Sequence, residues 1–190
     1  MKRVFFIAWF LLALATACNE GGLPVPDDDL ATKAEISQYV DELMLSLREG
    51  TLSSTYCPDV QWAHIPALLE YGKSTKVVGE GPVPGARAIP SNPISSFLMF
   101  ECSEGMFALW MVEAARIHTL HPSATGIGGW PSQNPFVQKM NESIFPTWYI
   151  NDPAVQQEVL DAYISWWKAA KGKKSAASKD PLEGTGYNWH

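Results

Sequence analysis

The sequence has few of the features that identify a common class of enzyme. It contains three cysteines in 190 residues, and it lacks a Cys-x-x-Cys pair, a Gly-rich phosphate loop, a nucleotide-binding fingerprint and a Ser-His-Asp order. It also lacks any apolar run of the roughly 20 residues that a transmembrane helix needs. Basic residues are fewer than acidic ones, 14 against 20, for a formal net charge of −6, which disfavours nucleic acid and anionic lipid surfaces. We therefore expect no cofactor and no nucleic-acid partner.

The N-terminus has the pattern of a secretory signal. Two basic residues precede an apolar segment at residues 4–14, which is too short to span a bilayer. Ala15 and Ala17 fit an ordinary small-residue cleavage site, and the same cut would make Cys18 the first residue of the mature chain. A cysteine at that place is typical of a bacterial lipoprotein, although Ala15 stands where leucine is usual. The pattern predicts a signal peptide over residues 1–17 and lipidation of Cys18.

The next segment differs in composition from the rest of the chain. Residues 18–29 contain Gly, Pro and acidic residues but little that could be buried, which predicts a flexible tether. The remainder, residues 30–190, is long enough for one domain with its own core. We expect a cell-envelope lipoprotein of a Gram-negative bacterium, held by its lipid anchor to the outer or the inner membrane.

Hydrophobic periodicity and capping signals predict an all-α domain. Thr32 and Glu35 have the spacing of a capping box, and Gly50 follows the apolar stripe that they begin. A later segment, from Met106 to Ile117, is apolar on nearly every side, which predicts a buried central helix. The predicted helices cover residues 33–48, 66–71, 93–118 and 153–170. The sequence leaves open whether the third of these helices is broken near Gly105.

Long loops rich in proline and glycine separate the predicted helices. They cover residues 73–91 and 122–131, and part of the first, near Val78, could be extended. Asn92 and Asn134 are each followed by proline and lie 42 residues apart, a spacing in the range of HEAT repeats. The spacing is a weak indication of stacked, HEAT-like helix pairs.

Two features of the sequence predict specific packing. Glu113 lies in the apolar helix, where an unpaired carboxylate would be costly, and Arg116 is three residues further on, so we expect an ion pair. Near the end of the chain, Tyr187 and Trp189 are too aromatic for a disordered tail. We expect residues 182–189 to fold back onto the helical domain and residues 172–179 to stay loose.

Several short motifs after the tether occur in an order that resembles a known family. They are IPALLEYG (65–72), NPISS (92–96), EC (101–102), LW (109–110) with EAAR (113–116), and WPSQNP (130–135). Together they resemble a family of uncharacterised lipoproteins from Bacteroidetes that carries a domain of unknown function, and the likeness covers most of residues 30–150. The resemblance implies an envelope lipoprotein with a mostly helical domain. It implies no activity and no catalytic residues.

With Cys18 assigned to the lipid, Cys57 and Cys102 remain as an even pair. Disulfides persist in exported proteins, so the two could be bonded and would then tether the loop before the second helix to the central segment. Alternatively, both are small buried apolar residues.

A cluster of titratable residues around positions 101–121 defines a catalytic alternative. His118 and His121 could bind a metal with Glu113 and Glu104, and Glu101 with Glu104 could form an acid/base pair. The spacing is not diagnostic, because histidines at a helix end need no ligand and carboxylates near a helix start are commonly caps. A hydrolase that uses these Glu and His residues is therefore the alternative hypothesis.

Tryptophans outside the helical stripes suggest a binding function. Trp62 and Trp130 lie in predicted loops, and Trp167 is off the apolar stripe of the last helix. Aromatic side chains at such positions could contact a ligand. The leading hypothesis is a binding or interaction module, not an enzyme, whose partner is a protein or an oligosaccharide.

Overall fold

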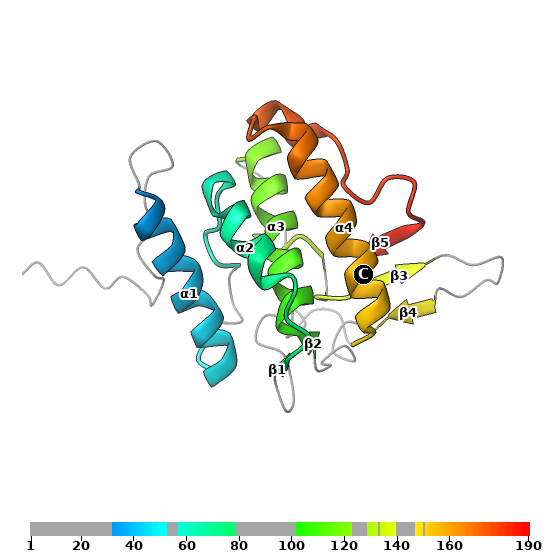
Figure 1. Ribbon diagram of the computed structural model, residues 1–190, viewed down its shortest axis with the longest axis horizontal. Coiled ribbons are helices and arrows are strands. Elements are labelled where there is room, and N and C mark those ends of the chain that lie inside the picture. The colour runs from blue at the N-terminus through cyan, green and yellow to red at the C-terminus, as the bar shows by residue number, and fades with distance from the viewer. Residues whose placement is uncertain are drawn as a thin grey trace, which may run out of the picture.

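The computed structural model describes residues 32–52, 57–78, 102–122, 129–132, 134–139, 147–149 and 151–190. The elements in chain order are α1 (Lys33–Glu49), η1 (Trp62–His64), α2 (Ile65–Tyr71), β1 (Val77–Val78), β2 (Cys102–Ser103), α3 (Glu104–Leu120), β3 (Val137–Lys139), β4 (Thr147–Tyr149), α4 (Pro153–Ala170), η4 (Lys174–Ser178) and β5 (Tyr187–Trp189). The helices α1 to α4 lie side by side in Figure 1, and the strands β3, β4 and β5 lie beyond α4. No described helix is both long enough and apolar enough to cross a membrane.

The predicted all-α fold is wrong, because the described residues also form two small antiparallel sheets. Strands β1 and β2 pair with each other, and β3 lies between β4 and β5 in a second sheet. The domain is therefore mixed α/β. Each strand has only two or three residues, so no alternation stands out in the sequence, and pairs such as Val137 with Trp189 join distant segments. The extended segment expected near Val78 is confirmed as β1.

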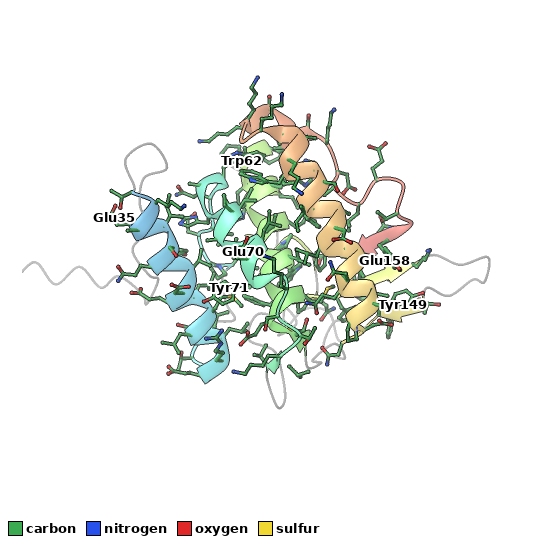
Figure 2. The ribbon with its side chains drawn as sticks, in the orientation of Figure 1. Glu35, Trp62, Glu70, Tyr71, Tyr149 and Glu158 are labelled. Atoms are coloured by element: carbon green, nitrogen blue, oxygen red, sulfur yellow. The ribbon has the colours of Figure 1, made fainter. Side chains whose placement is uncertain are left out.

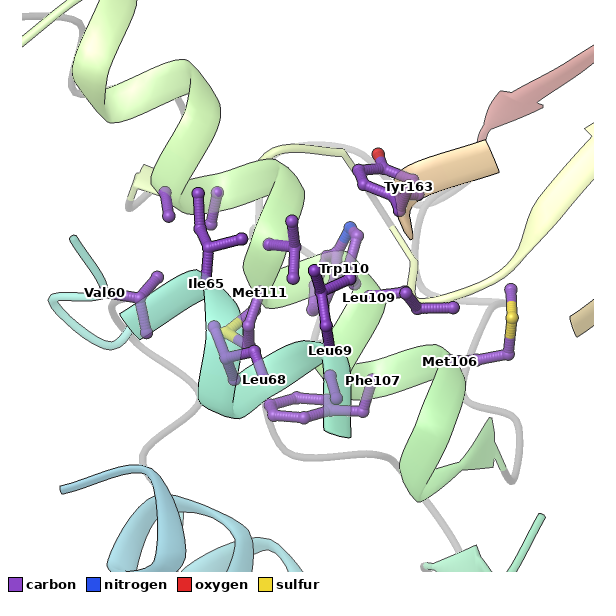
Figure 3. Packing of buried hydrophobic residues seen from close by; sticks show 14 of the residues in the cluster. Val60, Ile65, Leu68, Leu69, Met106, Phe107, Leu109, Trp110, Met111 and Tyr163 are labelled. Carbon is purple, nitrogen blue, oxygen red and sulfur yellow. The ribbon is translucent and has the colours of Figure 1, made fainter. Parts of the chain in front are cut away.

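Helix α3 is the predicted buried central helix, and this prediction is confirmed. Every residue from Glu104 to Ala115 is buried. The Ser103 hydroxyl accepts a hydrogen bond from the Met106 amide at 3.0 Å, so Ser103 caps the helix and the chain changes from strand to helix there. Figure 3 shows apolar residues of α2 facing those of α3, namely Ile65, Leu68 and Leu69 on one side and Phe107 and Met111 on the other.

Local sequence signals predicted the ends of the helices more accurately than hydrophobic periodicity and composition predicted the fold class. Thr32 and Glu35 form the predicted capping box, and Gly50 ends α1 with φ of 68°. The break left open near Gly105 is present, because Cys102 and Ser103 form β2 and α3 begins at Glu104. The part of the predicted third helix before residue 102 lies outside the described residues, as do all of residues 79–101. Asn134 leads into β3 and does not cap a helix, so the predicted HEAT-like pairing is not formed there.

The start of α3 packs closely on the turn after α2. A Cβ atom on Gly105 would lie 2.6 Å from the carbonyl oxygens of Gly72 and Ser74. The Gln156 side-chain amide of α4 donates to the same two oxygens at 2.9 and 3.0 Å. Because the start of α3, the turn after α2 and α4 come so close together here, only glycine fits at position 105.

The C-terminal segment is ordered throughout. Leu182 and Tyr187 are buried, and β5 pairs with β3, so the predicted return of residues 182–189 onto the domain is confirmed. The prediction of a loose segment at 172–179 is wrong. Residues in it form η4, Ala177 is buried, and the Arg116 guanidinium of α3 donates to the Ala177 carbonyl at 2.7 Å.

The predicted ion pair between Glu113 and Arg116 is confirmed and belongs to a larger network. Arg116 donates to both carboxylate oxygens, through Nη2 at 2.6 Å and Nε at 2.8 Å. The Tyr163 hydroxyl of α4 donates to Glu113 Oε2 at 2.8 Å and accepts from Trp189 Nε1 at 2.8 Å. Burial, followed by the charge of Glu113, raises the pKa of Tyr163 well above its ordinary value. The network connects α3, α4 and β5 inside the protein.

Candidate functional site

Two of the three tryptophans predicted to contact a ligand pack against each other instead. Trp62 is only 4% exposed, and its indole nitrogen donates to the Gly172 carbonyl at 2.9 Å. Its ring lies 5.2 Å from that of half-buried Trp167 and 5.5 Å from that of Trp166 (centroid distances). Figure 2 shows Trp62 among the helices. These contacts join η1 to the end of α4, and they explain the indole side chains without a ligand.

The third predicted tryptophan, Trp130, is also an internal packing residue. Its ring stacks on Trp110 of α3 with centroids 4.8 Å apart and an interplanar angle of 15°. Trp110 Nε1 in turn donates to the Ser132 hydroxyl at 2.7 Å. The buried Trp130 Nε1 has no hydrogen-bond partner among the residues that the structure describes, and Trp110 stacks on one face of the ring. The structure does not bring Trp130 together with Trp62 or Trp167 in one described site.

The two cysteines of the predicted disulfide are free thiols. Cys57 lies near the C-terminal end of α3, because a Cβ on Gly129 would be 3.5 Å from Cys57 Cβ and 3.4 Å from His118 Nε2. Cys102 comes just before the N-terminus of this 17-residue helix. At about 1.5 Å per residue the two ends are about 25 Å apart, whereas a disulfide needs Cα atoms within about 7 Å. The structure therefore does not form this bond.

Neither thiol has the surroundings of a nucleophile. Burial raises the pKa of the Cys102 thiol to about 12. Burial, together with the charge of Asp59, also raises the pKa of the Cys57 thiol. Both groups are protonated at neutral pH, and reactivity requires the thiolate.

The residues of the predicted hydrolase site do not come together. Glu104 lies at the start of α3 and His118 near its end, which places them about 20 Å apart along the helix. His118 Nε2 contacts the Gly129 carbonyl at 2.9 Å, His121 is exposed, and Glu101 lies outside the described residues. Among the residues that the structure describes, no group of three or more His, Cys, Asp or Glu side chains could hold a metal ion.

The contacts of Glu104 are those of a residue that stabilises the fold. Arg48 Nε donates to one carboxylate oxygen at 2.5 Å and the Ser74 hydroxyl donates to the other at 2.8 Å, while Lys76 Nζ lies 3.7 Å away. Burial alone would raise the pKa of Glu104, but the hydrogen bonds from Arg48 and Ser74 and the charges of Arg48 and Lys76 outweigh it. The pKa therefore lies below its ordinary value. A carboxylate that is ionised and fully paired is poorly suited to general-acid chemistry.

Among the residues that the structure describes, the most distinctive exposed surface is the outer face of the three-stranded sheet, which is the face directed away from α4. Gln138 of β3 is directly opposite Trp148 of β4 on one side and Asn188 of β5 on the other. Directly opposite residues of an antiparallel sheet project from the same face. Trp148 is 46% exposed, Asn188 is exposed and Gln138 is half-buried. A row of one indole and two amide side chains therefore crosses the sheet.

A second row on this outer face supports the exposed indole. The rings of Phe136 and His190 stack with centroids 5.1 Å apart, and the Trp148 ring lies 6.3 Å from the first and 5.3 Å from the second. Asn134 Nδ2 lies 3.1 Å from His190 Nδ1, and burial lowers the pKa of His190. The imidazole is therefore neutral at neutral pH. The rings of Phe136 and His190 thus support the Trp148 indole.

The opposite, inner face of the same sheet packs on α4. The Tyr187 hydroxyl donates to Glu158 at 2.9 Å, and Trp189 reaches Tyr163. Figure 2 shows Tyr149 and Glu158 in this region, where the sheet lies beside α4. Since one face is used for packing, only the outer face is left for a ligand.

The other exposed features of the described residues bring fewer side chains from different elements together than the sheet face does. A shallow depression of about 440 Å³ lies along α1, but all the residues that line it, from Ala34 to Leu45, belong to this one helix. Besides Trp148, the described part of the chain exposes two large apolar side chains strongly, Leu45 and Val77, and they stand on separate elements. We therefore take the outer face of the sheet as the candidate site.

Sequence reasoning missed all the residues of this face. Trp148 stands in the short segment Thr147-Trp148-Tyr149, and its exposure depends on pairing with β3. The only local signal was a run of residues with high strand propensity around Trp148. Such a run does not show which of its side chains would face solvent.

The protein is a small mixed α/β domain. On the outer face of its three-stranded sheet, the described side chains of Trp148, Gln138 and Asn188 lie in one row. The chain belongs to the family described as Domain of unknown function (DUF4943), whose model matches residues 31–190. No curated protein and no solved structure matches the chain. The function has to be argued from the surface of the domain.

Proposed function

We propose that the protein is a lipid-anchored binding module of the cell envelope of a Gram-negative bacterium, of the kind found in Bacteroidetes. Cys18 carries the lipid after removal of residues 1–17, and residues 18–29 tether the domain. The domain binds its partner through the outer face of the three-stranded sheet. This is an interaction function and involves no chemical step.

The position of Trp148 is the observation that carries this proposal. Trp148 is 46% exposed, and tryptophan is one of the residue types in which the energetic hot spots of binding sites are enriched. Here the ring lies against Phe136 and His190, the Gln138 amide stands beside it, and the Asn188 amide is one strand further on. Binding sites commonly combine a fixed aromatic group with a few polar groups that set the orientation of the ligand.

The hydrolase alternative has less support. Its carboxylate and imidazole groups stand at opposite ends of α3, and Glu104 is fully paired with Arg48 and Ser74. General acid/base catalysis needs both groups within hydrogen-bond reach of the same substrate.

The anchor is tested by comparing Cys18→Ser with Cys57→Ser in cell fractions. We expect Cys18→Ser to be released from membranes or to remain unprocessed, because acyl chains can attach only to Cys18. Cys57→Ser, a matched control that also removes one thiol, should stay in the membrane at mature size. If Cys18→Ser behaves like this control, the lipoprotein assignment fails.

The binding face is tested in living cells with the photo-crosslinking residue benzoylphenylalanine in place of Trp148. A matched control carries it in place of Leu45, whose exposure of 48% is close to the 46% of Trp148. We expect an adduct, with protein or with glycan, from position 148 and none from position 45. Equal adducts at both positions, or none at position 148, would refute the assignment of this face.

A further inference from the structure

The outer face has a chemical character that restricts what it can bind. Its described side chains are Phe136, Gln138, Trp148, Asn188 and His190, and none of them is ionised at neutral pH. Anionic ligands are normally held by arginine or lysine in paired hydrogen bonds. This face has no described basic side chain, so a phosphate, a sulfate or an acidic peptide would find no counter-charge.

The two amides are available for hydrogen bonding. Gln138 and Asn188 lie directly opposite each other, and neither side chain forms a hydrogen bond with the described part of the chain. A carboxamide offers two N–H donors and one carbonyl acceptor. A ligand hydroxyl, which is both a donor and an acceptor, can therefore be bound by a single amide. Two amides in a row can bind hydroxyls on neighbouring carbons or on neighbouring units of a chain.

The indole adds an apolar surface beside these amides. A pyranose ring has one face of C–H groups, which can pack on an aromatic ring whose electron-rich face attracts them. Trp148 is in the same row as Gln138. Neighbouring strands lie about 4.8 Å apart, so a hydroxyl of a sugar stacked on Trp148 can reach the Gln138 amide on the next strand, and a hydroxyl of the following unit can reach the Asn188 amide one strand further on.

A protein partner fits this face less well. The core of a protein interface is usually apolar and contains several buried aromatic or aliphatic anchors. On this face Trp148 is the one strongly exposed large apolar side chain among the described residues, and Phe136 is already buried. Peptides that extend a sheet bind along its edge, with pockets for alternate side chains. A flat row across three strands does not supply such pockets.

We infer that the outer face binds a neutral oligosaccharide, with one sugar unit stacked on Trp148 and with hydroxyls of this unit and its neighbour bound by Gln138 and Asn188. This inference rests on the proposed binding function of the face and adds the class of ligand. The contacts also imply weak dependence on ionic strength, because no charge pair forms.

The test is isothermal titration calorimetry of the full-length protein in a detergent that contains no sugar. The titrants are neutral hexasaccharides of α-glucan, β-glucan, xylan and chitin. We expect saturable binding of at least one of them, with a dissociation constant that changes less than about twofold between low and high salt. Trp148→Ala should weaken this binding by at least about tenfold, Trp148→Phe by less, and Gln138→Ala measurably.

The control variant is Leu45→Ala, which removes a similarly exposed apolar side chain from α1 and should leave the affinity unchanged within about twofold. Failure of all four hexasaccharides to bind, or equal binding by Trp148→Ala, overturns the inference. The photo-crosslinking result separates this failure from that of the proposed function. If a protein adduct forms at position 148 and no sugar binds, the inferred ligand class is wrong, but the outer face remains the binding surface.

Discussion

Replacing Glu113 by leucine tests whether the internal network stabilises the fold as its geometry indicates. The carboxylate is 5% exposed, accepts two hydrogen bonds from Arg116 and accepts a third from Tyr163. Without it the Arg116 guanidinium, which is mostly buried, keeps only the Ala177 carbonyl as a described partner. Removing one member of a buried ion pair costs about 3–5 kcal/mol, because the other charge stays buried without its partner.

This cost is large compared with the roughly 5–15 kcal/mol by which domains are stable. Urea unfolding followed by tryptophan fluorescence should therefore show a midpoint lower by about 2 M, given a slope of about 1–3 kcal/mol per molar for a domain of this size. The matched control is the double variant Glu113→Leu with Arg116→Met, in which no charge is stranded. We expect it to recover most of the loss, leaving about 1–2 kcal/mol for the hydrogen bonds of Tyr163 and Ala177.

Two results would refute this reasoning about the network. A loss below about 1 kcal/mol for Glu113→Leu would mean that Arg116 finds water or another partner. A double variant as unstable as the single one would mean that the cost comes from packing and not from the unpaired charge.

Three further perturbations follow from the structure. The pKa of Glu104 is lowered in the folded state, so its ionised form stabilises the protein fully above its ordinary pKa of 4.5, and this contribution is lost as the pH falls through the folded-state value. The difference in unfolding free energy between wild type and Glu104→Gln should therefore be constant from pH 7 to about 5 and shrink below it; a difference independent of pH would contradict the pairing. Gly105→Ala should lower the free energy of unfolding in urea by at least about 2 kcal/mol, because its Cβ would lie 2.6 Å from two carbonyl oxygens. The control Gly50→Ala has no atom within 4 Å of its Cβ and should cost only about 1 kcal/mol, for its positive φ. Equal costs for the two variants would show that the close contact at position 105 relaxes. Deleting residues 181–190 removes β5 and should lower the melting temperature by at least about 5 °C, and an unchanged melting curve would mean that the strand contributes nothing to stability.

The helices could be predicted because their signals are local. The capping box at Thr32, the Asp152-Pro153 start and the apolar stripes are all read within a few turns of one segment, and α1 and α4 have nearly the predicted ends. The ion pair of Glu113 could also be predicted, because its partner is three residues away. Each of these features depends on neighbours in sequence and not on the tertiary fold.

The strands and the candidate site depend on contacts between distant segments. Pairing of β5 with β3 joins the C-terminal segment to residues about fifty positions earlier, and no periodicity of two or three residues can reveal it. The same contacts decided which tryptophans are exposed. Trp62 was expected in a loop and is buried against Trp166, whereas Trp148 is exposed by its place on the outer face of the sheet.

The most direct test of the binding face is the indole N–H spectrum of the ¹⁵N-labelled full-length protein during titration with the four neutral hexasaccharides together. The Trp148 resonance is assigned by its loss in Trp148→Phe. We predict that this resonance shifts progressively and saturates, while those of Trp62, Trp130 and Trp167 stay in place, because their rings pack against other tryptophans away from the sheet face. A spectrum in which Trp148 does not move, or in which the three internal indoles move and Trp148 does not, would contradict the assignment of the outer face of the sheet as the binding surface.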